Sequence, residues 1–229
     1  MPGYILHLTA AQMFLQKRQK DYEILKDPQE RNAFLIGNLL PDTTKIKDRS
    51  HFRNPKYHDH MVEYPETKWF EDKYQGILKQ SSVLGYLFHL YIDRRFFKDY
   101  IPGIVEFRNE NDQEELKREK VKYVFLKRTK EKILKQDFFS EKYYYGDYTK
   151  MNTYLVKRYH IPIQLDPEIE NPGIEEVCYD DVRGVLGELE GYLKVPESAV
   201  KDIKVFGIED LLSFLEKIVE EFCVQKTKI

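Results

Sequence analysis

Residues Ser81 to Phe97 read SSVLGYLFHLYIDRRFF, and this segment is apolar on every side up to Ile92. A helix that is hydrophobic all round belongs in the interior of a protein, because it has no polar face to turn toward water. We therefore expect a buried central helix over residues 81–97, with the rest of the chain packed around it.

Two ionisable residues, His89 and Asp93, interrupt this apolar helix. Because they are four residues apart, their side chains lie on one face, about 5 to 6 Å apart at Cβ. Burial of two such groups is costly unless they pair with each other or bind a metal ion. Gly85, one turn earlier on the same face, has no side chain and would leave room for an ion or a substrate. A His–Asp pair satisfied within the core is the alternative interpretation.

Helical patterns flank the central segment on both sides. Apolar spacing predicts further helices at Thr9 to Leu25 with Thr9 as the cap, Arg31 to Leu40 ended by Pro41, Glu114 to Leu134 as a long surface helix, Tyr148 to Tyr159, Glu175 to Tyr192, and Ile208 to Val224. No convincing pair of strands with alternating polarity is visible. We expect an all-α fold, a multi-helix bundle that forms a single domain over residues 1–229.

Composition narrows the class of protein. The chain has 229 residues, of which 41% are hydrophobic, enough for one sizeable core. A formal net charge of −2 gives no general attraction to nucleic-acid polymers or anionic membranes. Cys178 and Cys223 form no CxxC motif, which argues against a disulfide framework or a zinc finger. Because the N-terminal segment does not resemble a secretory signal and no apolar run is long enough to span a membrane, we expect a cytoplasmic protein.

Histidines gather in an irregular segment, Asp42 to Pro65, which contains His51, His58 and His60. Long segments without periodicity in a compact domain are usually functional or disordered. Imidazole and carboxylate groups together suit zinc and similar divalent ions. His7 adds an imidazole near the N-terminus, although a lone histidine there is more often a core or capping residue than a metal ligand.

The order of these residues resembles the zinc-dependent phospholipase C family and its relatives, the S1/P1-type nucleases. His7 is followed by GNLLPD at Gly37 to Asp42, by SHF at Ser50 to Phe52, and by GYLFHLYID at Gly85 to Asp93. The similarity lies before Tyr100, and after that residue only general helicity matches.

The resemblance implies an all-α bundle with a cluster of zinc ions that hydrolyses phosphodiesters through a metal-activated water. By position, one ion would be held by Asp42, His51, His89 and Asp93. A second ion would be held by His7 together with Asp93 as a bridging carboxylate. Asp42 would also act on the nucleophilic water as the catalytic residue. The expected cofactor is one or two zinc ions, with manganese or another divalent ion as the alternative, and the expected substrate is a small phosphoester.

Two other functional interpretations remain open. The third metal site of the family needs a histidine shortly after Asp93 and then an H-x-x-x-E pair, and the sequence has neither. That loss is typical of a degenerate member that binds metal for structure, or binds a partner, without catalysis. An HD-type phosphohydrolase would instead use the doublet His58-Asp59 on a helix, which the neighbouring Pro55 disfavours.

The segment YYYGDYTKMN, Tyr143 to Asn152, is unusually rich in tyrosine. Its phenols and Asp147 would be able to line a cleft and bind a phosphate. We favour the simpler interpretation, a turn at Gly146 with Asp147 or Thr149 capping the next helix and the tyrosines packed in the core.

Overall fold

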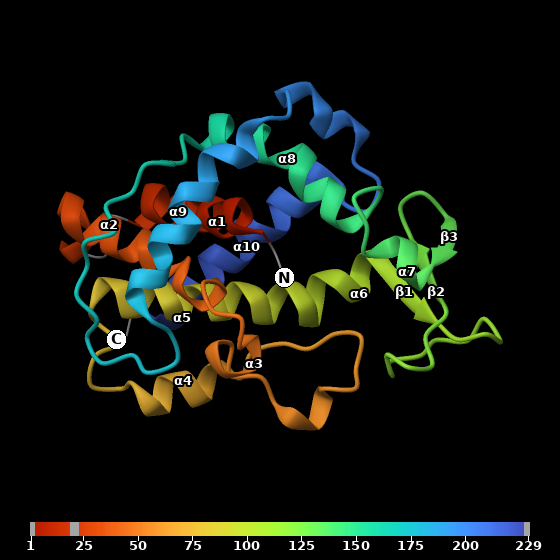
Figure 1. Cartoon of the computed structure of the whole chain (residues 1–229), viewed down its shortest axis with the longest axis horizontal. Helices are drawn as coiled ribbons and strands as arrows, with labels where there is room; N and C mark the ends of the chain where they lie inside the picture. The colour runs from red at the N-terminus through yellow and green to blue at the C-terminus, as the bar shows by residue number, and fades with distance from the viewer. Residues whose placement is uncertain (1–2, 19–22, 227–229) are drawn as a thin grey trace.

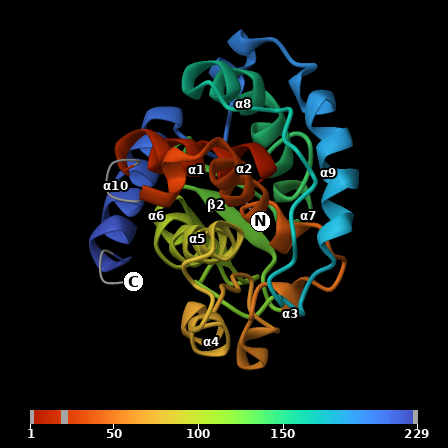
Figure 2. The same ribbon diagram turned by 90° about the vertical axis from the view of Figure 1, so that its left-hand side faces the viewer.

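The centre of the fold is a long helix, as the sequence predicts. A computed structural model describes residues 3–18 and 23–226. Helix α5 (Ser81–Arg95) is buried from Ser81 to Asp93, and a π-helical turn, η4 (Phe96–Tyr100), and the short helix α6 (Ile101–Ile104) extend it. This rod crosses the molecule in Figure 1, and Figure 2 views α5 end-on with other helices around it. The expectation of a mostly helical protein with a buried central helix is confirmed.

The remaining helices surround α5. They are α1 (Tyr4–Arg18), α2 (Pro28–Gly37), α3 (Lys47–Ser50), α4 (Thr67–Lys73), α7 (Lys135–Phe138), α8 (Tyr144–Tyr159), α9 (Val182–Leu189) and α10 (Ile208–Lys226). Short 3-10 helices join them, namely η1 (Glu23–Lys26), η2 (Leu40–Asp42), η3 (Pro55–Tyr57), η5 (Tyr179–Asp181), η6 (Glu190–Leu193) and η7 (Glu197–Asp202). Helices α1, α2, α4 and α10 all contact α5, with α1 and α2 on one side of it and α4 on the opposite side (Figure 2).

An aromatic cluster forms the core between these helices. Phe14 of α1 lies 5.1 Å from Phe34 of α2 and 5.3 Å from Phe88 of α5, measured between ring centroids. Phe222 of α10 lies 4.9 Å from Phe88. Stacked, tilted and edge-on ring pairs at these distances add to the hydrophobic energy of burial, so the four helices share one packed interior.

Helices α2 and α5 approach each other through glycines. A Cβ atom on Gly37 would lie 2.2 Å from the carbonyl oxygen of Ser82, and one on Gly85 would lie 2.1 Å from the carbonyl oxygen of Phe34. Gly85 therefore allows close packing of two helix backbones. The expectation that it leaves room for an ion is wrong, because the backbone of α2 fills that space.

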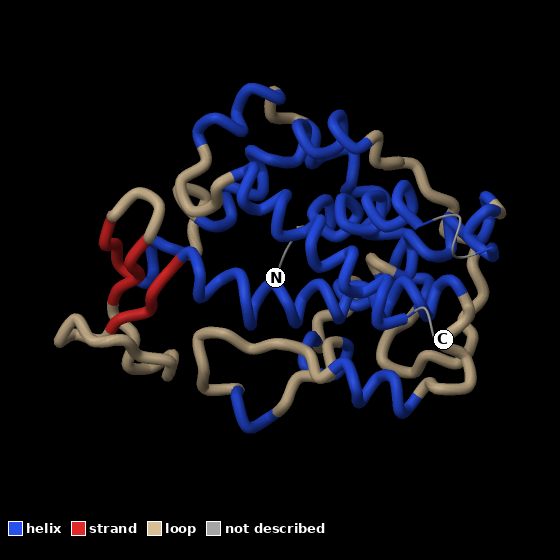
Figure 3. Tube along the Cα trace, turned by 180° about the vertical axis from the view of Figure 1, so that it is seen from behind, coloured by secondary structure: helices blue, strands red, loops and turns tan. Residues whose placement is uncertain are grey.

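A small antiparallel sheet replaces the surface helix predicted for Glu114 to Leu134. Its strands are β1 (Val105–Arg108), β2 (Tyr123–Leu126) and β3 (Glu131–Leu134), in that order, with Val105 opposite Leu126 and Tyr123 opposite Leu134. Figure 3 shows the sheet at one end of the molecule, beyond the rod. Burial along β2 alternates, which is the period of a strand and not of a helix. The all-α expectation is thus wrong for this segment, where β-branched and aromatic residues on both sides of a tight turn favour a hairpin.

The predicted helix boundaries shift in the N-terminal half. Helix α1 begins at Tyr4, so Thr9 lies inside it and donates its hydroxyl to the carbonyl of Ile5 at 2.7 Å instead of capping it. The predicted helix Thr9 to Leu25 also includes residues 19–22, which lie outside the described residues. Helix α2 begins at Pro28 with Asp27 as its cap, three residues before the predicted Arg31.

The C-terminal predictions hold with smaller shifts. Helix α8 starts four residues before the predicted Tyr148, and α10 matches the prediction closely. Helix α9 covers only the later part of the predicted range Glu175 to Tyr192. None of the described helices is long and apolar enough to cross a membrane.

The segment Asp42 to Pro65 is mostly irregular, as predicted. It contains the single-turn helices α3 and η3 and little other regular structure. Phe52 has a φ of 49°, in the left-handed region that side chains other than glycine adopt at a cost. Its ring packs edge-on against Phe70 at 5.4 Å, and this contact helps to hold the backbone turn directly after His51.

Candidate metal centre

Five side chains from four parts of the chain meet at one buried point. His7 lies on α1 and Asp42 ends η2, whereas His51 follows α3. His89 and Asp93 lie on α5. The three imidazoles are 0% exposed, and Asp42 and Asp93 are 7% and 1% exposed. These are the five residues that the sequence nominates as metal ligands.

His89 turns its Nε2 atom toward the cluster. Its Nδ1 lies 2.8 Å from the carbonyl oxygen of Asn38, which can only accept a hydrogen bond, so Nδ1 carries the proton. Nε2 then presents a lone pair, as a metal-binding imidazole does. Burial, reinforced by the neighbouring His7, lowers the pKa of His89 to about 3. The ring is therefore neutral near pH 7.

His51 is oriented in the same way. Its Nδ1 lies 3.1 Å from the carbonyl oxygen of Lys47 and 2.9 Å from the hydroxyl of Ser50, which again places the proton on Nδ1. The two Nε2 atoms of His51 and His89 are 3.2 Å apart. Because both are lone-pair nitrogens, their approach is unfavourable unless a proton or a cation lies between them.

Asp93 lies between imidazoles on two sides. Its Oδ1 is 3.2 Å from Nε2 of His7, and its Oδ2 is 3.4 Å from Nε2 of His51 and 3.9 Å from Nε2 of His89. Burial acts to raise the pKa of Asp93, but the imidazoles, His7 first among them, outweigh burial and lower the pKa to about 2. The carboxylate is therefore ionised and has one oxygen facing each side of the cluster.

Asp42 completes the cluster on the side nearest to solvent. Its Oδ1 is 3.4 Å from Nε2 of His51 and accepts a hydrogen bond from Nζ of Lys47 at 2.9 Å. Burial acts to raise the pKa of Asp42, whereas His51, His89 and Lys47 together hold it well below its usual range. Asp42 is thus an ionised carboxylate that faces the histidines and a partly exposed lysine.

The donor atoms fit a divalent cation in chemistry and in spacing. Atoms bound about 2.0 to 2.2 Å from zinc at tetrahedral angles are about 3.3 to 3.6 Å apart, close to the 3.2 and 3.4 Å separations around His51. Two groups have donor atoms within 4.8 Å of one another, namely His7–His89–Asp93 and Asp42–His51–His89. Both nitrogens of His7 and both oxygens of Asp93 are buried without a hydrogen-bond partner among the described residues. A cation would satisfy Nε2 of His7 and the two oxygens of Asp93, so the cluster can hold a metal ion.

A cavity of about 360 Å³ opens beside Asp42. Lys47 and Asp42 lie in its wall. Four tyrosines also line it, namely Tyr4, Tyr145, Tyr148 and Tyr192. The cavity connects the carboxylate side of the cluster with space large enough for a small molecule. We call it the tyrosine cavity.

The tyrosine-rich segment both packs in the core and lines this cavity. Tyr144 and Tyr148 are buried, as the favoured interpretation predicts, whereas Tyr145 is 46% exposed. Gly146 does not form a turn. It lies in the first part of α8, where a Cβ atom would lie 1.8 Å from the carbonyl oxygen of Glu141.

The predicted helix cap in this segment is also wrong. The carboxylate of Asp147 accepts hydrogen bonds from the backbone N–H groups of Lys204, Val205 and Phe206 at 2.7 to 3.2 Å. Asp147 therefore fixes the segment before α10 onto α8.

The remaining loop histidines lie outside the buried cluster. The side chains of His58 and Asp59 are 43% and 52% exposed, and they follow η3 instead of lying on a helix. His58 bonds to Glu63 at 3.0 Å, and Asp59 pairs with Lys117 at 3.1 Å. This geometry gives no support to an HD-type site. Asp48, His58 and Glu63 form a third group with donor spacing, but Asp48 and His58 are exposed.

Sequence reasoning missed the residues that orient the ligands. Asn38 holds His89 through its carbonyl oxygen, and Ser50 donates its hydroxyl to the carbonyl of Pro41 at 2.8 Å beside His51. The hydroxyl of Tyr86 donates to the carbonyl of Ser50 at 2.6 Å. A signal existed, because Asn38 and Ser50 lie within the quoted motifs GNLLPD and SHF. A backbone carbonyl, however, has no sequence signature of its own.

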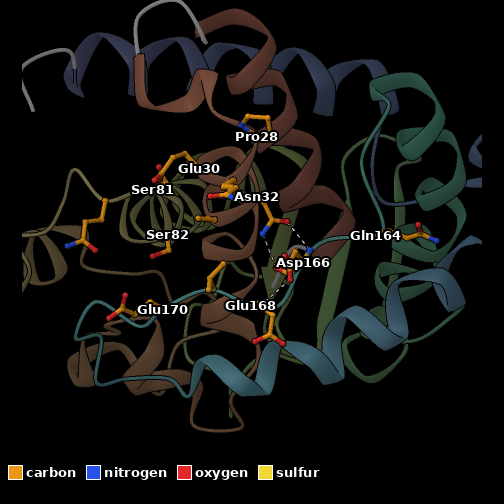
Figure 4. A pocket seen from close by; sticks show the side chains of 13 residues that line it. Pro28, Glu30, Asn32, Ser81, Ser82, Gln164, Asp166, Glu168 and Glu170 are labelled. Carbon is orange, nitrogen blue, oxygen red and sulfur yellow. Dashed lines mark hydrogen bonds between the residues drawn. The ribbon is translucent and has the colours of Figure 1, made fainter.

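A wider cavity of about 780 Å³ lies between α2 and residues 164–170 (Figure 4). Asn32 donates to the carbonyl of Asp166 at 2.8 Å and accepts from its N–H at 2.9 Å. The side chains of this wall include carboxylates but no imidazole or thiol among the described residues. It lacks the donor set of the buried cluster, so size alone does not mark the functional site.

Comparison with known proteins adds no assignment: no family model, curated protein or solved structure matches the chain.

Proposed function

We propose that the protein is a metal-dependent phosphoesterase of the kind that the resemblance to zinc-dependent phospholipase C implies. The observation that supports this most strongly is the meeting of five buried donors, two of them imidazoles with lone pairs 3.2 Å apart. A purely structural His–Asp pair would require neither the second carboxylate nor the third imidazole. The tyrosine cavity beside Asp42 supplies the space for a substrate.

In this proposal His51, His89, Asp42 and Asp93 hold one ion, and His7 with Asp93 holds a second. Divalent ions in such a site lower the pKa of a bound water toward 7 and neutralise charge on phosphoryl oxygens. Asn38 keeps the His89 ring in the ligating tautomer through the 2.8 Å hydrogen bond.

The carboxylate of Asp42 has the position and ionisation state of a hydrogen-bond acceptor. It is ionised, it borders the tyrosine cavity, and one of its oxygens faces His51. A water or a substrate hydroxyl in the cavity would donate a hydrogen bond to it. Lys47, which binds the same carboxylate, holds it in this orientation and offers a positive charge toward the cavity.

Metal content and turnover test the proposal together. Protein purified without added metal is analysed by elemental analysis, and a panel of phosphodiesters and monoesters is assayed with zinc, manganese and other divalent ions. We expect bound metal and hydrolysis that a chelator abolishes. Bound metal at full occupancy without turnover of any ester would favour a metal-binding scaffold instead. Absence of bound metal would overturn both the phosphoesterase and the scaffold interpretation.

A further inference from the structure

A further cavity, of about 440 Å³, is lined by three cations, Arg53, Arg118 and Lys135, of which Arg53 lies two residues after His51. They come from separate parts of the chain: the segment after α3, the connection between β1 and β2, and the first residue of α7. Glu63 is the carboxylate in this wall. We call this space the cationic cavity, since its lining side chains carry a positive formal charge.

Carboxylates pair two of the three cations, and among the printed contacts of the described residues Lys135 has an uncharged partner only. Glu63 accepts from Arg118 at 2.8 Å, which pairs one cation. Lys135 donates to the carbonyl oxygen of Arg118 at 2.7 Å, an uncharged group. Arg53 pairs with Asp48 at 3.2 Å, yet its Nε is buried without a hydrogen-bond partner among the described residues. Two guanidinium groups and an ammonium around one space are typical of phosphate recognition.

The cationic cavity and the tyrosine cavity adjoin each other. Tyr145 lines both. Tyr144 lies in the wall of the cationic cavity and accepts a hydrogen bond from Tyr148, which lies in the wall of the other cavity, at 2.8 Å. Phe97 lines the cationic cavity one helical turn after Asp93, so it projects from the same side of the rod. A ligand that reached from Asp42 past Tyr145 would enter the cationic cavity, because this side chain lies in the walls of both.

We propose that the cationic cavity binds a second phosphate group of the substrate while the scissile phosphoester lies at the metal centre. The aromatic side chains of Phe97, Phe139 and Tyr145 form the apolar wall against which the part of the substrate between the two groups packs. The substrate class is then a small phosphodiester that carries an additional phosphate. This inference rests on the proposed function, because only a phosphoesterase would make the bound ligand a substrate.

Two chromogenic substrates that differ by one phosphate test the inference. They are the 4-nitrophenyl phosphodiester of thymidine on the 5′ hydroxyl, with and without a phosphate on the 3′ hydroxyl. In the metal-loaded full chain, Lys135→Met should raise KM for the substrate with the extra phosphate by about tenfold, the size expected for loss of one charge-assisted contact. KM for the other substrate and kcat for both should change by less than about twofold, because Lys135 lies outside the ligand cluster.

The matched control is Lys79→Met, the same change at an exposed lysine outside both cavities. It should alter neither KM. Arg118→Gln is the second variant at the site and should show the same selectivity as Lys135→Met. An equal effect of Lys135→Met on both substrates, or no effect on either, would overturn the inference.

Sulfate separates failure of the inference from failure of the proposed function, because it resembles phosphate and needs no turnover. Sulfate should raise the Tm of the wild type and of Lys79→Met equally, and that of Lys135→Met less. General salt stabilisation is common to the three proteins, so the difference reports binding in the cavity. Sulfate binding that depends on Lys135, without turnover of any ester, would refute the substrate role and leave an anion site. Equal Tm shifts in all three would refute the site itself.

Discussion

At the scale of single residues, Asp93 is the side chain on which both halves of the cluster depend. Its two oxygens face different imidazoles, at 3.2 Å from His7 and 3.4 Å from His51. Asp93→Asn keeps the shape but replaces one ligating oxygen by an amide nitrogen that cannot ligate. We expect this variant to bind less metal per chain, by elemental analysis, than His7→Ala, which removes one ligand from one side only.

Asp99→Asn is the control for this change. Asp99 lies on the same rod, but its side chain is 41% exposed and pairs with Arg95 at the surface. The Asp99→Asn variant should therefore bind as much metal as the wild type. Full metal occupancy in Asp93→Asn would contradict the bridging position.

The buried imidazole of His89 predicts how the metal-free protein responds to acid. Its pKa is lowered to about 3 in the folded state by burial, whereas an unfolded histidine titrates near 6.5. The unfolded state thus binds more protons between these values, and stability rises with pH across that window. We expect the free energy of unfolding to fall by up to about 4 kcal/mol as the pH drops from 6.5 to 3.

Denaturant unfolding at pH 7 and pH 4.5 measures this effect. His89→Gln, which has no proton to gain, should lose clearly less stability between the two pH values than the wild type. His58→Gln, at an exposed histidine, should behave as the wild type does. Identical pH dependence in all three proteins would show that His89 does not resist protonation.

At the scale of elements, the contact between α2 and α5 sets the position of the ligands. A Cβ at Gly85 would lie 2.1 Å from the carbonyl oxygen of Phe34, so Gly85→Ala must push the two helices apart. We expect a loss of about 1 to 3 kcal/mol in the free energy of unfolding. Because Asn38 directly follows α2 and holds His89, metal affinity should fall as well.

Gly187→Ala provides the comparison, since this glycine lies in α9 with no heavy atom within 4 Å of a built Cβ. It should stabilise the protein by up to about 1 kcal/mol, because alanine favours the helix. Denaturant unfolding and metal titration of both variants check the pair. Full stability in Gly85→Ala would disprove the close contact.

Elements with a clear apolar pattern within their own segment were predictable from the sequence. Elements that depend on contacts with other parts of the chain were not. The all-round apolar character of α5 and the stripe of α10 are local properties of the sequence. The segment Glu114 to Leu134 has apolar residues at mixed spacings. Its hairpin, β2 and β3, pairs with β1 from outside the segment, and a third strand stabilises a hairpin that is marginal alone. The five clustered residues were identifiable by their chemistry and order. The contacts of Lys47 with Asp42 and of Asn38 with His89 were not, because they depend on how the chain turns between α2 and α3.

At the scale of the whole molecule, a bound ion should stabilise the fold that creates its site. The donors come together only in the folded chain, so metal binds the native state in preference to the unfolded one. With free metal at about a thousand times Kd, linkage adds about 4 kcal/mol. For a chain of this size that corresponds to a rise in Tm on the order of 10 °C.

Scanning calorimetry with zinc and with a chelator measures the shift. Chelation should remove most of the metal-dependent rise in the Tm of the wild type. The Tm of Asp93→Asn should rise less with zinc than that of the wild type. A Tm that chelation leaves unchanged would mean that the five side chains form their contacts without an ion.

The position of the ligands along the chain has a consequence for the order of synthesis. All five lie between His7 and Asp93, whereas the tyrosine cavity takes Tyr145, Tyr148 and Tyr192 from later segments. A ribosome therefore makes the complete donor set before it makes much of the wall that encloses it, and the donors converge when the domain folds as a unit. We expect metal to enter while the domain folds and to exchange slowly from the finished protein, where the three imidazoles are 0% exposed.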